Sequence, residues 1–283
     1  MSTRIGGKVV PYLFIAPFII SFIVFFLYPG INSLVLSLYN YPGYGHAVWV
    51  GLHNYSAALT DPFFWVAFRN TIFYWVAHAV PVIVISFLLA LGIHSQLVKW
   101  KSVIKPLVFF PQVVPTIAAA LVFQFIFSSG IFARSGGGSV LSNPDFARWA
   151  VVIFTGWGSI GWFTIVFLAG LTTVSEELYE AAAIDGASSW NRMFRITIPL
   201  MRPIFSFAFV MDGISSIQSY TGPNVLLAGS GQAPADAMPL LNLVQSNITG
   251  GSFGLASAFG WLTFLIIAII SVLQLILFRG NDQ

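Results

Sequence analysis

The sequence predicts an all-α membrane protein with six transmembrane helices. Charged residues make up 7% of its 283 positions and hydrophobic residues 57%, whereas about a quarter of a soluble domain is charged. A chain with so little charge cannot cover a water-soluble surface, so lipid is its expected solvent. Because lipid offers the backbone no hydrogen-bond partner, each crossing requires a helix of about 20 apolar residues. Six stretches qualify, at approximately residues 10–29, 71–93, 106–129, 150–171, 203–221 and 257–278.

The first stretch follows Arg4 and Lys8, as the apolar part of a signal peptide does. It is too long for a signal peptide and lacks a small-x-small cleavage site, so we expect an uncleaved anchor. The loops at about 30–70, 130–149 and 222–256 are too short for a separate domain. We therefore expect residues 1–283 to form a single transmembrane domain.

Basic residues predict the orientation. Six spans place both termini on one side, and the positive-inside rule makes that side the cytoplasm. Nine of the twelve basic residues then lie in the cytoplasm, namely Arg4, Lys8, Lys99, Lys101, Lys105, Arg192, Arg195, Arg202 and Arg279. The net charge of +3 is too small to indicate nucleic-acid binding.

The loop at residues 172–199 carries an unusual concentration of charge for this chain. Ser175 suits a helix N-cap and Gly186 the left-handed position after a helix end, which predicts a short helix near 176–185. A second helix should run from Ser188 or Ser189 to Pro199. Two short helices at an angle would form a protruding knob, although an ordinary amphipathic interfacial helix is an equally good interpretation of the composition.

Three motifs carry a resemblance to a known family. Glu180-Ala181-Ala182, followed by Asp185-Gly186-Ala187 and by residues 194–199 (FRITIP), resembles the EAA loop of ABC importer permeases. Residues 105–115 (KPLVFFPQVVP) resemble the third-span entry of the sugar-importer branch, and residues 226–231 (LLAGSG) resemble a weakened form of its outer loop. The resemblance covers nearly the whole chain and points to the larger membrane subunit of the maltose-type transporter.

The resemblance implies a type I ABC importer permease in the cytoplasmic membrane of a prokaryote, with no cofactor of its own. Its implied partners are a second permease subunit, two copies of a cytoplasmic ATPase and an extracytoplasmic solute-binding protein. It also implies that the loop is a coupling helix seated in the ATPase through Glu180, Ala181, Ala182, Asp185 and Gly186. The weakened outer loop lies on the substrate side, so the resemblance does not name the sugar.

Thr155, Gly158, Ser159 and Trp162 recur at helical spacing and share one face of the fourth span. Hydroxyls and an indole are what a sugar site needs, and these positions match sugar-contacting ones in the resembling subunit. The alternative is that small residues let helices pack closely and Trp162 fills a gap.

The fifth span carries Asp212, Ser216 and Tyr220, which we also expect along the substrate pathway. An acid within a span is costly and usually faces protein or a water-filled cavity. Asp212 could bind a substrate hydroxyl or amine, or a basic residue of a partner, and an interhelical hydrogen bond is the alternative. We expect Gln124 to form an interhelical bond, and His78, like the other histidines, to lie in an interface or loop.

The predicted function is half of an ATP-driven import channel for a mono- or oligosaccharide. Alternatives are a permease for glycerol phosphate or a polyamine, an ATP-independent transporter and an intramembrane enzyme. The spans contain no basic residue for a phosphate and no paired catalytic groups, whereas Asp212 leaves an amine open. The chain also lacks a phosphate-binding loop, so ATP hydrolysis is expected in the partner subunits.

Overall fold

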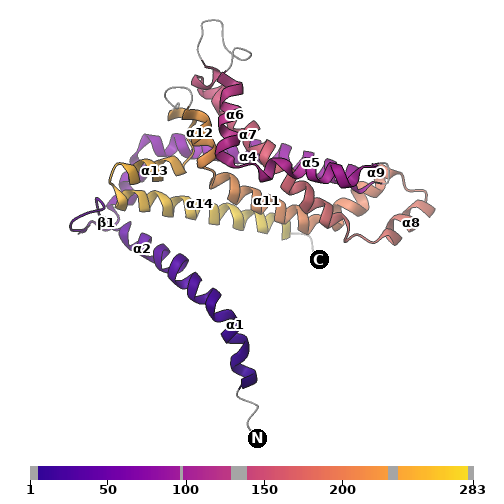
Figure 1. The fold of residues 1–283 in the computed structure, drawn as a ribbon, viewed down its shortest axis with the longest axis horizontal. Helices are drawn as coiled ribbons and strands as arrows, with labels where there is room; N and C mark the ends of the chain where they lie inside the picture. The colour runs from indigo at the N-terminus through magenta and orange to yellow at the C-terminus, as the bar shows by residue number, and fades with distance from the viewer. Residues whose placement is uncertain (1–5, 96–97, 129–138, 229–234, 280–283) are drawn as a thin grey trace. The chain divides into compact units, whose positions relative to one another are not determined.

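The computed structural model describes residues 6–95, 98–128, 139–228 and 235–279, and nearly all of its elements are helices (Figure 1). The chain divides into two compact units, Met1–Asp61 with Leu243–Leu262 and Pro62–Asn242 with Thr263–Gln283. Arg4, Arg134 and residues 229–231 of the predicted outer-loop motif lie outside the described residues. The single domain expected over residues 1–283 stays a prediction.

The first unit starts with an apolar helix that could span a membrane over Tyr12–Leu36. Its elements are α1 (Gly6–Phe22), a π-helical turn η1 (Ile23–Leu27), α2 (Tyr28–Leu36), β1 (Tyr39–Asn40), β2 (Val48–Trp49) and α3 (His53–Thr60). The two short strands are antiparallel, with Tyr39 opposite Trp49. Asn54 of α3 fixes the end of the hairpin, because its Nδ2 donates 2.9 Å hydrogen bonds to the carbonyl oxygens of Ser37 and Tyr39.

The second unit is a helix bundle. Its elements are α4 (Pro62–His94), α5 (Lys101–Val113), α6 (Thr116–Ser128), η2 (Val140–Ser142), α7 (Pro144–Leu171), α8 (Glu176–Ile184), α9 (Ser189–Arg192), η3 (Met193–Thr197), α10 (Ile198–Leu200), α11 (Arg202–Ile217), α12 (Thr221–Ala228) and η4 (Ala235–Ala237). Two further helices, α13 (Leu241–Thr249) and α14 (Phe253–Arg279), have residues in both units. Helices α4 and α7 pack along each other, and α5 and α11 pack beside them (Figure 1).

Six spans are present if each of two bent helix pairs counts as one span. The predicted third span, at residues 106–129, contains one of these bends, whereas the other bend lies just before the predicted fifth span, at residues 203–221. The third bends by 90° between α5 and α6, and the fifth by 65° before α11. Pro115 disfavours the helical conformation at Val114, which is extended (φ −71°, ψ 129°). The fifth span breaks at Met201, just before Arg202-Pro203 at the start of α11.

Two apolar clusters form the core of the second unit. One surrounds Tyr74 and Phe154. The other surrounds Phe87, Phe167 and Phe205, whose ring centroids lie 4.8 to 5.6 Å apart. Between the clusters, α4 and α7 carry polar residues near their midpoints, which places these residues near the middle of the bilayer.

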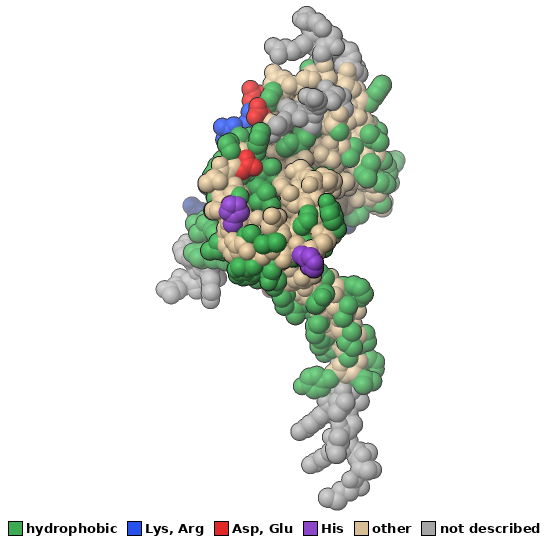
Figure 2. Space-filling model, turned by 90° about the vertical axis from the view of Figure 1, so that its left-hand side faces the viewer, with side chains coloured by type: hydrophobic (Ala, Val, Ile, Leu, Met, Phe, Trp, Pro, Cys, Tyr) green, Lys and Arg blue, Asp and Glu red, His purple; other side chains and the backbone are tan. Residues whose placement is uncertain are grey.

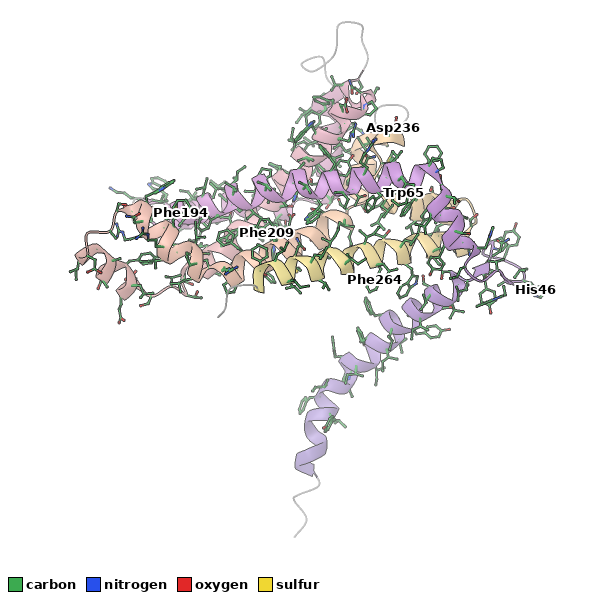
Figure 3. All side chains as sticks on the ribbon, turned by 180° about the vertical axis from the view of Figure 1, so that it is seen from behind. His46, Trp65, Phe194, Phe209, Asp236 and Phe264 are labelled. Carbon is green, nitrogen blue, oxygen red and sulfur yellow. The ribbon has the colours of Figure 1, made fainter. Side chains whose placement is uncertain are left out.

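The surface of the bundle is apolar, as a lipid-facing surface must be. Many large hydrophobic side chains of its helices are exposed, and Figure 2 shows hydrophobic side chains spread over one face among other groups, with few acidic or basic side chains. Figure 3 shows Trp65 toward one end of the second unit and Phe194 toward the opposite end, with Phe209 between them. Trp65 is 53% exposed and Phe194 49%. Exposed aromatic residues toward both ends suit the two membrane–water interfaces.

Candidate functional site

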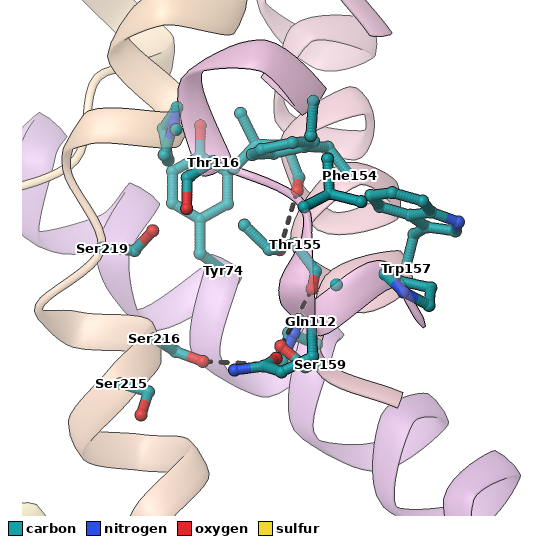
Figure 4. Close-up of a pocket in the computed structure, with 18 residues that line it drawn as sticks. Tyr74, Gln112, Thr116, Phe154, Thr155, Trp157, Ser159, Ser215, Ser216 and Ser219 are labelled. Carbon is teal, nitrogen blue, oxygen red and sulfur yellow. Dashed lines mark hydrogen bonds between the residues drawn. The ribbon is translucent and has the colours of Figure 1, made fainter. Parts of the chain in front are cut away.

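A cavity of about 220 Å³ lies between the two apolar clusters, where α4, α5, α6, α7 and α11 meet (Figure 4). Its polar lining includes His78, Gln112, Thr155, Ser159, Ser216 and Ser219. Among the described residues, no Asp, Glu, Lys or Arg lines it. The aromatic rings of Tyr74, Phe154 and Trp157 complete the walls. Neutral hydroxyl and amide groups beside flat rings can bind an uncharged polyhydroxylated ligand.

The α7 wall presents hydroxyl oxygens to the cavity. Thr155 Oγ1 donates to the Val151 carbonyl oxygen at 2.8 Å, and Ser159 Oγ donates to the Thr155 carbonyl oxygen at 2.9 Å. Each hydroxyl thus donates its proton to a carbonyl oxygen of its own helix, while the lone pairs of the hydroxyl oxygen can still accept a hydrogen bond. These two residues therefore favour a ligand that donates hydrogen bonds.

Gly158 lies on the same wall, and a Cβ placed there would meet no atom within 4 Å. Close helix packing instead uses Gly161, where a Cβ would collide with the Val108 carbonyl oxygen of α5. The absence of a side chain at Gly158 therefore leaves space in the cavity, which argues against a packing role for this glycine.

The opposite wall comes from the end of α11 and the turn after it. Figure 4 shows Ser215, Ser216 and Ser219 on this side, facing Thr155 and Ser159. Of the predicted pathway residues, the structure thus brings together Thr155, Gly158, Ser159 and Ser216 around one cavity.

Trp162, Asp212 and Tyr220 do not line this cavity. Trp162 follows Ser159 by three residues, about 4.5 Å along the helix, and is 42% exposed. Tyr220 lies beyond the end of α11, which ends at Ile217. Asp212 is only 1% exposed and lies behind the wall.

Asp212 instead pairs with a histidine of its own chain. The distance from His78 Nδ1 to Asp212 Oδ1 is 2.9 Å, and the side chains are 6% and 1% exposed. His78 was expected in an interface or loop, and this was wrong, because it is buried near the middle of α4. Its sequence position inside the second span was the available signal, since a buried acid needs a polar or basic partner.

Gln124 of α6 forms the interhelical bond that was predicted. Its Nε2 donates to the Val225 carbonyl oxygen of α12 at 2.6 Å. This bond ties the bent third span to α12 and leaves Gln124 outside the cavity lining.

The charged loop forms the two predicted short helices. Ser175 Oγ accepts the Glu177 N–H at 3.3 Å and caps α8. At the other end, the Ala187 N–H donates to the Ala182 carbonyl oxygen at 2.8 Å and the Gly186 N–H to that of Ala183 at 3.1 Å. With Gly186 at φ +74°, this is a Schellman motif. The second helix starts after Ser188, whose Oγ accepts the Asn191 N–H at 3.2 Å.

Contacts at its base hold α8 in place and leave its outer surface free. Tyr179 Oη and Thr197 Oγ1 are 2.8 Å apart, which joins α8 to η3. The predicted coupling residues Glu180, Ala181, Asp185 and Gly186 are exposed, and Ala182 is half-buried. Ile184 beside them is 87% exposed. Within the described part of the chain, neither Glu180 nor Asp185 forms an ion pair, so this surface can receive a basic partner.

Comparison with known families identifies a match over most of the chain. Residues 83–283 match the family described as binding-protein-dependent transport system inner membrane component. The arabinooligosaccharides transport system permease protein AraP of Bacillus subtilis (strain 168) is 32% identical over 288 positions, which cover 97% of this chain and 91% of that protein. The lactose transport system permease protein LacF of Rhizobium radiobacter is 31% identical, with coverage of 93% and 92%.

A solved structure has the same fold. It is a bacterial ABC transporter involved in the import of the acidic polysaccharide alginate, and one of its chains superposes with a TM-score of 0.74. The two chains are 20% identical, and the superposition covers 97% of this chain and 96% of that one. A chain of a known ABC importer therefore shares the fold of this chain.

Substitution at Gly158 and Gly161 should separate cavity volume from helix packing. Gly158→Leu would fill open space in the cavity, so transport should fall at least tenfold with little change in thermal stability. Gly161→Ala should instead lower the stability, because overpacking costs about 1–3 kcal/mol. Uptake and thermal unfolding of both variants test this, and full transport with Gly158→Leu would show that nothing passes through the cavity.

Proposed function

Because the chain belongs to the family of binding-protein-dependent transport system inner membrane components, we propose that it forms half of the pathway of an ATP-driven sugar importer. As a member of this family it is a transport component of the inner membrane and not an enzyme. The observation that carries the sugar assignment is the cavity, whose lining combines hydroxyl, amide and imidazole groups with aromatic rings and, among the described residues, contains no Asp, Glu, Lys or Arg.

The other solutes fit this lining less well. Glycerol phosphate would need a basic residue, and a polyamine would need a carboxylate. Asp212, the one buried acid in the described part of the chain, is 2.9 Å from His78 and does not line the cavity. The names of the relatives also favour a sugar, since AraP and LacF are permeases for arabinooligosaccharides and lactose.

A second permease subunit should complete the site. The cavity of about 220 Å³ is smaller than the roughly 300–1,000 Å³ of pockets that enclose drug-sized ligands. A wall from the partner subunit would enlarge it into a full pathway. Trp162 and Tyr220 would then meet the sugar beyond this cavity, with the exposed indole of Trp162 providing a flat surface for a sugar ring.

The loop between α7 and α11 would transmit the ATPase motion. It would lie in the cytoplasm together with both termini, and the α8 surface at Glu180, Ala181, Ala182, Asp185 and Gly186 would dock into the ATPase dimer. Since Tyr179 and Thr197 join α8 to η3, closure of the dimer would tilt the attached spans as rigid bodies. A solute-binding protein would deliver sugar on the opposite side.

The test of this function is a reconstituted complex with its ATPase and binding protein. Arabinooligosaccharides, lactose, maltose and trehalose would be screened for stimulation of ATP hydrolysis, with spermidine and glycerol 3-phosphate as comparisons. At least one sugar should stimulate hydrolysis and accumulate only when ATP is present. Stimulation by spermidine or glycerol 3-phosphate alone, or uptake without ATP, would contradict the proposal.

Charge reversal at Glu180 should uncouple ATP hydrolysis from sugar transport. The loss of a charge-assisted hydrogen bond, worth about 1.5–3 kcal/mol, predicts at least a tenfold fall in sugar-stimulated ATP hydrolysis for Glu180→Lys. Membrane insertion should be unaffected because the residue is exposed. Glu180→Gln keeps the size of the side chain and should have a smaller effect. Unchanged coupling in Glu180→Lys would remove the proposed role of this residue.

A further inference from the structure

We infer that His78 is a specificity-determining residue of the cavity, that it accepts a hydrogen bond from a substrate hydroxyl, and that Asp212 positions it. This inference rests on the proposed sugar transport and concerns a residue that the sequence motifs did not single out. Its basis is an imidazole whose Nδ1 lies 2.9 Å from a buried carboxyl oxygen and whose Nε2 has no hydrogen-bond partner among the described residues.

The Nδ1 edge of His78 faces α11. Nδ1 lies 2.9 Å from Asp212 Oδ1 and 3.4 Å from Ser216 Oγ, and Figure 4 marks the second contact with a dashed line from Ser216. Asp212 is buried and does not line the cavity, whereas His78 and Ser216 do. The carboxylate is therefore placed to orient the ring from behind and not to bind a substrate itself.

The opposite edge of the ring faces the α7 wall. A Cβ built on Gly156 would lie 3.9 Å from His78 Cδ2, the ring atom bonded to Nε2. Nε2 is buried and has no hydrogen-bond partner among the described residues. A buried polar atom without a partner is unfavourable, so a hydroxyl brought to this position would gain a bond that the chain does not supply.

The carboxylate also determines which role Nε2 can play. An acceptor oxygen 2.9 Å from Nδ1 favours, by electrostatic attraction, the tautomer with the proton on Nδ1, which leaves a lone pair on Nε2. Thr155 and Ser159 on the neighbouring wall donate their protons to the backbone and likewise present lone pairs. Together these groups select a substrate hydroxyl that donates, and they disfavour a methyl ether at the same position.

Nε2 is closed to solvent in this conformation, so the substrate contact requires a small opening between α4 and α7. Tilting of the spans during transport would supply such a movement. His78 also lies near the middle of α4, within the predicted span at residues 71–93. A sugar halfway across the bilayer would therefore meet His78 where water is scarce.

Substitution of His78 in the reconstituted complex tests this. His78→Asn retains an amide at the Nδ1 position for Asp212 but lacks the Nε2 atom. It should raise the sugar concentration for half-maximal ATPase stimulation about tenfold and leave the maximal rate within twofold, as expected for loss of one hydrogen bond. Asp212→Asn keeps the size of the side chain but removes the charge that orients the ring. It should also raise the sugar concentration for half-maximal ATPase stimulation. His94→Asn, the same change at an exposed position of α4, is the control and should have no effect.

Methyl ethers of the stimulating sugar provide a second readout. In the complex without substitutions, methylation of one particular hydroxyl of the sugar should raise the concentration needed for half-maximal ATPase stimulation. In the His78→Asn complex, methylation of the same hydroxyl should have no such effect. If the His78→Asn complex does not assemble, two measurements test the role of His78: the half-maximal sugar concentration of the Asp212→Asn complex, and the response of the complex without substitutions to the methyl ethers. Unchanged half-maximal concentration and unchanged discrimination in the variants, or no ether discrimination in the unmodified complex, would overturn the role of His78 while the transport function stands. A complex that no sugar stimulates would overturn both.

Discussion

The bilayer imposes the constraint on which the rest of this structure depends: a polar group within it must find a partner inside the protein. The chain meets this constraint in two ways near mid-depth. Hydroxyls of Thr155 and Ser159 donate to their own helix backbone, and Asp212 pairs with His78. The backbone bonds satisfy the hydroxyl protons of Thr155 and Ser159, whereas both carboxyl oxygens of Asp212 and Nε2 of His78 are buried without a hydrogen-bond partner among the described residues. Acceptor atoms therefore remain at or near the cavity. A polar route can therefore exist in the centre of a bundle whose outer surface is apolar.

Helices α7 and α11 connect the cavity to the exposed loop that carries α8. Helix α7 forms one cavity wall and ends at Leu171, shortly before α8 begins. On the far side of the loop, α11 carries Ser216 to the opposite wall. Aromatic packing among Phe87, Phe167 and Phe205 joins α4, α7 and α11, and Phe167 lies between the cavity residue Ser159 and the end of α7 at Leu171. A force applied at α8 would thus reach both walls through packed helices, without a flexible linker.

Sequence reasoning located most of this arrangement, and its errors have identifiable causes. The caps of α8 follow local chemistry at Ser175 and Gly186, so both ends of that helix could be predicted. Thr155, Gly158 and Ser159 obey helical periodicity and do line one cavity. The pair of His78 with Asp212 could not be predicted in this way, because it joins residues 134 positions apart. The bend in the third span follows from Val114-Pro115, a local signal that the span assignment did not use, and the chain also breaks at Met201 just before Arg202-Pro203.

The account requires that the cavity lies on a pathway that opens to one side of the membrane and then to the other, and the most direct test is the reactivity of a single thiol in the cavity. The chain contains no cysteine, so Ser216→Cys introduces one unique site, and Ser86→Cys at a buried position outside the cavity is the control. A charged, membrane-impermeant thiol reagent should reach the Ser216→Cys thiol from one side of the membrane without nucleotide. With a non-hydrolysable ATP analogue it should reach the thiol from the other side, in a complex with cysteine-free partners. Labelling that ignores nucleotide, or no labelling from either side, would contradict the account.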